Sequence, residues 1–598
     1  MIRSGVGLWA LSLAFLACDN QHDVFLGSAL SGSGGNSGSG GGASGGACTM
    51  CGNVATFSHP SAPSNAATLF ADARKQPRGV SPEREPELIY PNHETKFPSN
   101  VPSARCEWRA GSENTLFELQ LRGERSAAVV YTAETSWQPA DDLWDAVWTA
   151  LARENVGRSV LLSVRALDSN GAVFESAPVS LFFGAPLRDG PIYYWSTTAR
   201  GLMRSELRAD ALPQRLTLPT DGKADTGCSG CHALASDGKH LAFDDGAGLQ
   251  LADLMALEPT LVAAGSGGAD AGTGKMDKLG PDAPAVWPAF SPDGTRILLA
   301  AQGELALLDA NGAPVSSEMV TLPGKAVAAH PSWSPLGDRV VFTLAEKGTA
   351  RFVEKGQIAS MSFADDRFGP IEILVPNEPG AENNLFPAVS PDGNFVAFVS
   401  TRAKSYNSAP GTLRLLRLSD RATFTLERLN ARVNNQDAIG NVGNSMPSWV
   451  PATDAGSLWL SFSSARAYAG VRPQDPKRDQ LWIAAIDPTQ DEPSLAAFWA
   501  PFQRLSQANH RAQWGPASVG AQCGCHELCG DAIDNDCDGS ADEADCVATC
   551  ALEDICDDGI DNDCDCVIDD CNELCDDAID NDRDGYIDAA DPLCGGKP

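Results

Sequence analysis

A Ser-Pro-Asp-Gly turn that recurs along the chain constrains the fold of this protein more than any other sequence feature. The clearest copies, such as FSPDGTRILLA and VSPDGNFVAFVS, place an apolar residue before the turn and a β-strand after it. The anchor residues of the six copies, three of them weaker, are Leu234, Phe290, Trp333, Val389, Trp449 and Trp514. Their spacing of about 43 to 65 residues indicates radial repetition of a four-stranded unit.

The chemistry of the turn explains why these residue types recur. Pro292 fixes the first φ of its turn, Gly294 accepts a positive φ at its end, and the apolar anchor packs between units. Asp293 is therefore interpreted as structural and not as catalytic. The motif resembles the blade turn of TolB-type β-propellers, and this resemblance implies a six-bladed propeller over residues 190–520.

Residues 87–185 predict a separate, mainly β domain. Segments of alternating or β-rich sequence lie at 116–121 and around Val164 and Leu181, and Asp168-Ser-Asn-Gly171 predicts a hairpin turn. The pattern of short strands and turns resembles a fibronectin type III or immunoglobulin-like β-sandwich. The whole chain is thus expected to be mainly β.

The first residues predict export. An apolar run from Val6 to Leu16 is too short for a permanent membrane span, so residues 1–17 are interpreted as a signal peptide. Phe15-Leu16-Ala17-Cys18 resembles the lipobox of bacterial lipoproteins, which implies lipidation of Cys18 and a place in the cell envelope, at the outer membrane or cell surface. Periplasmic location or simple secretion, with an incidental Cys, is the alternative. Residues 18–86 are predicted to form the anchor and a Gly/Ser-rich linker.

The negative charge of the chain is concentrated near its C-terminal end. The formal net charge is −34, and residues 523–598 hold 25 Asp and Glu against two Arg and Lys. A nucleic-acid partner needs clustered Lys and Arg, so this balance argues against one. It suits a divalent metal as a partner instead.

Within residues 523–598, carboxylates recur with the spacing of calcium-binding loops. The first copy places Asp at loop positions one, three, five, nine and twelve, with Gly539 at position six. A later copy around Gly585 repeats this pattern, whereas a middle copy has Cys566 in place of Gly and Asn572 at position twelve. The predicted metal ligands are Asp534, Asp536, Asp538, Asp542, Asp545, Asp561, Asp563, Asp565, Asp569, Asp580, Asp582, Asp584, Asp588 and Asp591.

The same copies resemble repeats of the MopE type, a family associated with metal or copper binding. The segments that carry the resemblance are CGDAIDNDCDG, CDDGIDNDCDC and CDDAIDNDRDG, within residues 529–594. Copper prefers nitrogen and sulfur ligands, so the carboxylates favour calcium over copper. The twelve Cys from Cys523 to Cys594 predict a disulfide-rich segment with little apolar core.

A second candidate cofactor site precedes the first propeller turn. Cys228-Ser-Gly-Cys231-His232 has the spacing of a c-type haem attachment motif. Aligned with the other turns, His232 falls where a later copy has Pro288, which places it near the mouth of the predicted channel. Three interpretations stay open: covalent haem, a disulfide between the two Cys, or a metal site or free thiols. If haem is present, the candidate distal ligands are His330, His510 and Met446.

Together these features predict an exported, non-enzymatic binding or scaffold protein with a calcium-binding C-terminal module and no catalytic residues. The expected partner is a small ligand at the propeller channel or another envelope protein, with membrane contact only through a lipid anchor. The alternative is an envelope c-type haem protein with a redox role. A serine hydrolase is disfavoured, because nothing after Trp514 could form an α/β-hydrolase domain.

Overall fold

The computed structural model describes most of the chain between residues 53 and 515, and these residues are mainly β-strand. The longer internal stretches outside the description are 138–147, 217–231, 255–285, 403–410, 432–442, 452–457 and 467–478. Within the described part, no helix is long and apolar enough to cross a membrane. The predicted signal peptide, the candidate lipidation site Cys18 and residues 523–598 all lie outside it.

The N-terminal domain consists of two sheets and a short helix, α1 (Ala66–Asp72). The larger sheet contains β1 (Asn53–Ser58), β7 (Ser126–Thr132), β6 (Asn114–Arg122), β9 (Ser159–Asp168), β10 (Ala172–Glu175), β2 (Arg74–Lys75), β11 (Val179–Gly184) and β4 (Thr95–Pro98). The smaller sheet contains β3 (Glu87–Tyr90), β5 (Cys106–Arg109) and β8 (Ser136–Trp137). The two sheets share one apolar core, in which Trp108 of β5 lies edge-on to Phe117 of β6, with ring centroids 5.7 Å apart.

This domain begins earlier than predicted. Strand β1 runs parallel to β7, from Asn53 opposite Ser126 to Ser58 opposite Tyr131, so the predicted linker of residues 18–86 is too long. The sequence-based boundary was wrong because the partner of β1 lies far along the chain, where local alternation cannot indicate it. The predicted hairpin is confirmed: the Asp168 carboxylate accepts hydrogen bonds from the backbone N–H groups of Asn170 and Ala172, both at 2.8 Å.

Six sheets of the second domain form blades in the part of the chain that the structure describes. Blade one has β36 (Asn509–Trp514), β12 (Ile192–Ser196), β13 (Gly201–Ser205) and β14 (Gln214–Arg215). Blade two has β15 (Ala233–Leu234), β16 (His240–Asp244) and β17 (Leu249–Asp253). Blade three has β18 (Trp287–Phe290), β19 (Arg296–Ala301) and β20 (Glu304–Asp309). Blade four has β21 (Val327–Trp333), β22 (Arg339–Ala345), β25 (Gln357–Ala364), β26 (Arg367–Phe368) and β27 (Glu372–Val375).

The remaining blades complete the circle. Blade five has β28 (Asn383–Val389), β29 (Phe395–Thr401), β30 (Thr412–Arg417) and β31 (Thr423–Thr425), and blade six has β32 (Ser445–Trp449), β33 (Leu458–Ser464), β34 (Gln480–Ile486) and β35 (Phe498–Trp499). Three short elements lie beside these sheets: β23 (Lys347–Gly348), β24 (Val353–Glu354) and α4 (Glu427–Asn430).

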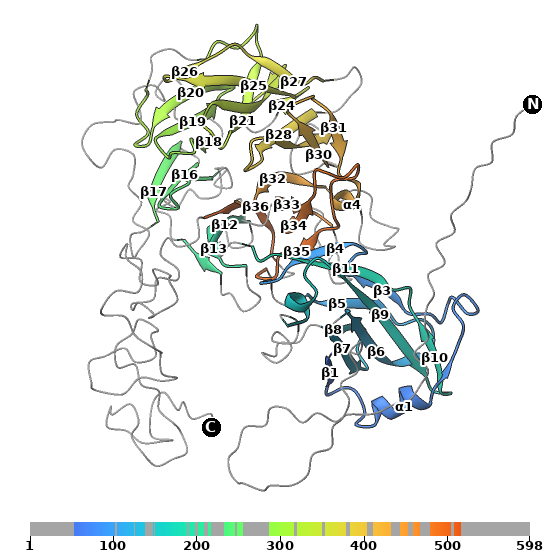
Figure 1. Ribbon diagram of the computed structural model, residues 1–598. Coiled ribbons are helices and arrows are strands. Elements are labelled where there is room, and N and C mark those ends of the chain that lie inside the picture. Colours follow the sequence, from blue (N-terminus) through green and yellow to red (C-terminus); the bar gives the residue numbers. More distant parts are fainter. Residues whose placement is uncertain are drawn as a thin grey trace, which may run out of the picture.

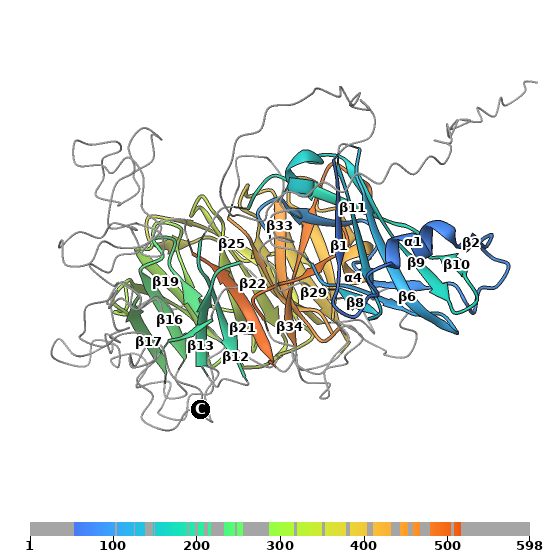
Figure 2. The same cartoon turned by 90° about the horizontal axis from the view of Figure 1, so that it is seen from below.

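The inner strands of the blades form a closed ring (Figure 1). Strand β15 contacts β18, and contacts continue through β21, β28, β32 and β36 back to β15. The last strand, β36, pairs antiparallel with β12, so the two ends of the domain share one blade. Figure 2 shows the sheets side by side from below. The prediction of a β-propeller is therefore confirmed by the strand pairing.

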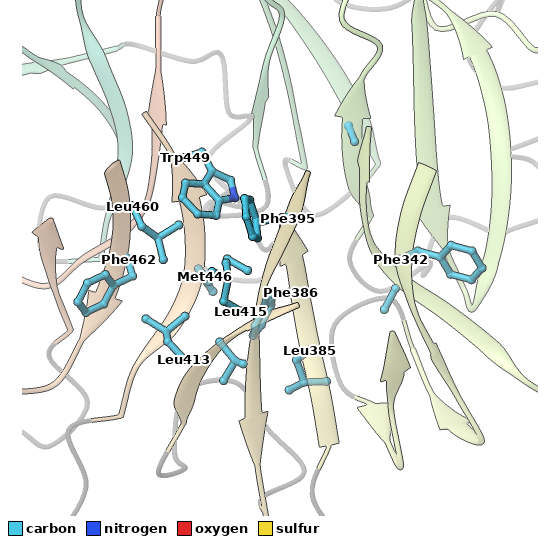
Figure 3. Packing of buried hydrophobic residues seen from close by; sticks show 14 of the residues in the cluster. Phe342, Leu385, Phe386, Phe395, Leu413, Leu415, Met446, Trp449, Leu460 and Phe462 are labelled. Carbon is cyan, nitrogen blue, oxygen red and sulfur yellow. The ribbon is translucent and has the colours of Figure 1, made fainter. Parts of the chain in front are cut away.

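The recurring anchor residues bind each blade to its neighbour. The Trp333 indole N–H donates to the Ala289 carbonyl at 3.1 Å, and the Trp449 indole N–H donates to the Ala388 carbonyl at 2.9 Å. Figure 3 shows Trp449 within a cluster of apolar side chains contributed by neighbouring blades. Because buried indole N–H groups need an acceptor, these hydrogen bonds fix the position of each indole ring between its two blades.

The turns after the anchors have the predicted structural role. Gly294 has a φ of 68°, which favours glycine, and Asp293 accepts hydrogen bonds from the Ser291 hydroxyl at 2.5 Å and the Thr295 backbone N–H at 3.1 Å. The Ser291 hydroxyl is the main reason that the pKa of Asp293 lies below its usual value. The Asp of this motif thus stabilises its own turn.

The two domains are joined by a continuous core on blade six. The Tyr90 hydroxyl of the N-terminal domain accepts a hydrogen bond from the Trp499 backbone N–H at 3.1 Å. Phe97 and Phe498 lie with ring centroids 5.2 Å apart, within one apolar cluster that spans both domains. A shared apolar core of this kind holds domains in a fixed relation more firmly than a polar contact does.

Candidate functional site

A cavity of ≈ 340 Å³ opens at the end of the ring where the Ser-Pro-Asp-Gly turns lie. We call it the mouth cavity and define it by five residues, one from the inner strand of each of five blades. These residues are Trp287, His330, Phe386, Met446 and Arg511. The volume lies at the lower end of the range for small-molecule sites, so the cavity suits a small ligand.

Four of these residues share an unusual backbone conformation. Each has a positive φ without being glycine, and in each case the pairing with the next strand shifts register there. The φ values are 51° for His330, 54° for Phe386, 49° for Met446 and 50° for Arg511. Such a conformation costs on the order of 1–3 kcal/mol per residue and is concentrated at functional sites. The bulges re-aim one side chain per strand toward the axis of the ring.

Aromatic side chains form the floor of the mouth cavity. The Trp287 and His330 rings meet edge to face with centroids 4.7 Å apart, and the His330 and Phe386 rings are 4.1 Å apart. Phe386 and Met446 also appear in Figure 3, on the inner strands of blades five and six. Because three aromatic rings and a thioether meet at the axis, the floor is mainly apolar.

Arg511 supplies the positive charge of the cavity. Its guanidinium lies over the Trp287 ring, 4.1 Å from the centroid, and its side chain is 8% exposed. Burial lowers the pKa of Arg511 to about 9, so the side chain remains charged at neutral pH. In the residues that the structure describes, no carboxylate pairs with it, and its Nη1 atom is buried without a hydrogen-bond acceptor.

His330 is the other titratable residue of the lining. Burial is the main cause, and the charge of Arg511 the second cause, that lowers the pKa of His330 to about 3. Its Nδ1 lies 3.3 Å from the Thr343 hydroxyl, whereas its Nε2 is buried without a hydrogen-bond partner among the described residues. The imidazole is therefore neutral across the physiological range.

Of the residues that the sequence analysis proposed for haem, the structure describes His232, His330, Met446 and His510. His232 is fully buried just before β15, and the cavity lining includes the next residue, Ala233, but not His232 itself. Cys228 and Cys231 lie outside the described residues. His330 and Met446 both line the mouth cavity, at equivalent positions on the inner strands of blades four and six, and the alignment of the turns had suggested this equivalence.

His510 has a different setting. Its Nε2 lies 3.0 Å from the Thr197 hydroxyl and its Nδ1 lies 3.4 Å from an Asp479 carboxylate oxygen. These contacts link β36 to the segments before β13 and β34, so His510 supports the closure of the ring and does not line the mouth cavity.

The predicted calcium ligands, from Asp534 to Asp591, lie outside the described residues. Within the described part of the chain, no group of three or more His, Cys, Asp or Glu side chains is arranged to hold a metal ion. Calcium binding by residues 523–598 thus remains a prediction from sequence.

The sequence analysis missed Arg511. Four of the other five copies place a proline directly after the residue at this position, as Pro331 follows His330, but Ala512 follows Arg511. The copy at Trp514 is also truncated after the anchor. Alignment on the anchor residue, with Trp514 set against Trp333 and Trp449, would have placed Arg511 with His330 and Met446.

Comparisons with known proteins give the following result. No protein-family model and no curated protein matches the sequence. Among solved structures, the chain is similar to TolB from Agrobacterium tumefaciens, with 16% identity and a TM-score of 0.30 over 56% of this chain and 100% of that one. It is similar to a chain of the nidogen/laminin complex (11% identity, TM-score 0.33, 55% of this chain and 99% of that one). It is also similar to the β-propeller domain of Cps50 (Swd1) from Myceliophteria thermophila (14% identity, TM-score 0.27, 52% of this chain and 90% of that one).

These TM-scores are too low to carry an argument. The assignment of a β-propeller therefore depends on the six sheets and on the pairing of β36 with β12.

The buried His330 predicts a loss of stability in mild acid. The folded state keeps this imidazole neutral down to a pKa of about 3, whereas the unfolded chain takes up the proton near pH 6.5. The free energy of unfolding should therefore fall as pH drops below 6.5, by about 2 kcal/mol from this group at pH 5. The fall in the free energy of unfolding between pH 7.5 and pH 5, measured with urea, should be smaller in His330→Gln than in the wild type. The exposed His93→Gln should match the wild type; an unchanged fall in His330→Gln would contradict the assignment.

Proposed function

We propose that this protein is an exported, non-enzymatic binding protein whose propeller mouth holds a small ligand. The observation that carries the proposal is the mouth cavity, into which bulges in four separate inner strands aim side chains in a costly conformation. Natural sequences retain such strain where a site needs particular side chains in fixed positions. The rigid N-terminal domain then serves as a scaffold beside the propeller.

The groups in the cavity suit binding better than proton transfer. Efficient general acid–base catalysis needs a group whose pKa lies near the working pH, and the pKa of His330 lies far below it. Trp287, Phe386 and Met446 supply apolar contact area, and Arg511 supplies a single charge. An apolar site with a few fixed polar groups is the usual composition of a ligand pocket.

Features of the sequence support more specific assignments for each part of the chain within this proposal. The lipobox-like segment ending at Cys18 supports a lipid-anchored protein of the cell envelope, and the turn motif supports a TolB-type propeller. The alternating strands of the N-terminal domain support a fibronectin type III-like or immunoglobulin-like origin. The Asp and Cys spacing in residues 523–598 supports a MopE-type module that binds calcium.

Filling the mouth cavity should abolish ligand binding without unfolding the protein. Ser448 lines the cavity, is partly exposed, and has no hydrogen bond from its hydroxyl among the described residues, so Ser448→Trp adds bulk there at small structural cost. A thermal-shift screen with a panel of small metabolites should give hits with the wild type that are lost in Ser448→Trp. Ser169→Trp, in an exposed hairpin of the N-terminal domain, should keep them. Hits that survive Ser448→Trp would place the site elsewhere.

Calcium removal should loosen residues 523–598. The clustered carboxylates repel one another without a cation, so chelation should speed proteolysis of this segment in the full chain while its disulfides stay intact. Asp534→Asn combined with Asp580→Asn should lower the calcium bound per chain. Asp531→Asn with Asp577→Asn makes the same charge change outside the loop positions and should leave the bound calcium unchanged. Equal calcium binding in both double variants would refute the prediction that these loops bind calcium.

A second candidate function is a c-type haem protein with a redox role. The spacing of Cys228, Cys231 and His232 supports it, and His232 lies one residue before the lining of the mouth cavity. Protein purified from a host competent in cytochrome maturation should show c-type haem absorbance, lost in Cys228→Ser with Cys231→Ser. A colourless preparation excludes this function and leaves the binding proposal in place.

A further inference from the structure

Arg511 is a buried cation for which the described part of the chain provides no anion. Its backbone N–H donates to the Ser463 hydroxyl at 3.0 Å, which fixes the residue, but its guanidinium makes no hydrogen bond or ion pair with a described residue. Among the described residues, the charged group stacks on Trp287, with the guanidinium 4.1 Å from the ring centroid. Stacking of this kind stabilises a cation by less than the cost of burying one.

Among the described residues, the cavity lining offers no counter-charge for Arg511. Arg511 and His330 are the only titratable residues of this described lining, and a neutral imidazole cannot balance a guanidinium charge. Buried charges in proteins are paired or hydrogen-bonded, so a guanidinium that faces a cavity and has no partner among the described residues can be paired by a ligand bound in that cavity. The partner must be an anion.

The charge balance selects the class of anion. A monoanion neutralises Arg511, whereas a phosphate monoester dianion would leave a second negative charge in the cavity, with no Lys and no other Arg in its lining. A planar guanidinium also matches the two oxygens of a carboxylate in a bidentate arrangement. The aromatic floor formed by Trp287, His330 and Phe386 suits an apolar or aromatic body on the same ligand.

We propose that the mouth cavity binds a small organic monocarboxylate, with the carboxylate on the guanidinium of Arg511 and the apolar body on the floor. This inference rests on the proposed function, since it names the ligand class of the same cavity. We expect a compact ligand, because the cavity volume of ≈ 340 Å³ lies at the lower end of the range for small-molecule sites.

The test compares matched compounds with the full-length protein. Calorimetric titration would use a panel of small aromatic and aliphatic monocarboxylates, including phenylacetate, and for each acid its neutral amide and the phosphate ester of the related alcohol. At least one acid should bind at least 10-fold more tightly than its amide and its phosphate ester. Arg511→Met should lose this preference, whereas Arg122→Met, an exposed arginine of the N-terminal domain, should keep it.

A second measurement separates binding from a structural role of Arg511. Replacing an unpaired buried charge with an apolar side chain of similar length removes a desolvation cost, so the urea midpoint of ligand-free Arg511→Met should equal or exceed that of the wild type. The His330 imidazole should also titrate at higher pH in this variant, because the charge of Arg511 no longer opposes its protonation. A lower urea midpoint with no loss of binding would overturn the proposal.

The outcomes distinguish the two levels of inference. If amides or phosphate esters bind as tightly as the acids, and Ser448→Trp blocks them, the cavity is a ligand site but the carboxylate assignment is wrong. If no acid of the panel binds and the metabolite screen gives only uncharged or cationic ligands, the carboxylate assignment is again wrong. If the screen gives no ligand that Ser448→Trp removes, both inferences fail together.

Discussion

The antiparallel pairing of β36 with β12 is the interaction on which the rest of the propeller depends. It runs from Ile192 opposite Trp514 to Ser196 opposite Asn509, and it supplies the first blade with its inner strand. Without it, blades two and six would face an open gap with unpaired edges, which favour aggregation. Arg511 lies on this same strand, so the guanidinium reaches the mouth only in the closed ring. A ligand that binds there therefore also stabilises closure.

The bulges at the cavity residues connect the fold to the site. In a regular strand, alternate side chains point to opposite faces of the sheet and pack against the neighbouring blades. A bulge with a positive φ turns one side chain toward the axis instead, as it does at Phe386 and Met446. The anchors that follow, such as Trp449, then recover the register and pack between blades. One local irregularity in each of four blades thus separates the residues that line the cavity from those that pack between blades.

Sequence reasoning predicted the propeller because its signal is local and repeated: a fixed turn, an anchor and a strand in each copy. It failed for β1, whose parallel partner β7 lies beyond the intervening helix α1 and five other strands. It also missed the pairing of Arg511 with Trp287, since the two residues are far apart in sequence and meet only through ring closure. His330 and Met446 were proposed from sequence as haem ligands because their turns align well, and both line the mouth cavity. What could not be predicted are the contacts that depend on long-range closure.

The charge distribution of the chain limits how Arg511 can act. The chain carries a formal charge of −34, most of it in residues 523–598, and this field opposes the approach of any anion. At physiological salt, however, exposed charges are screened beyond about 8 Å, whereas a buried cation next to an apolar floor is screened much less. The attraction of Arg511 therefore acts mainly at short range, on an anion that has already reached the mouth cavity.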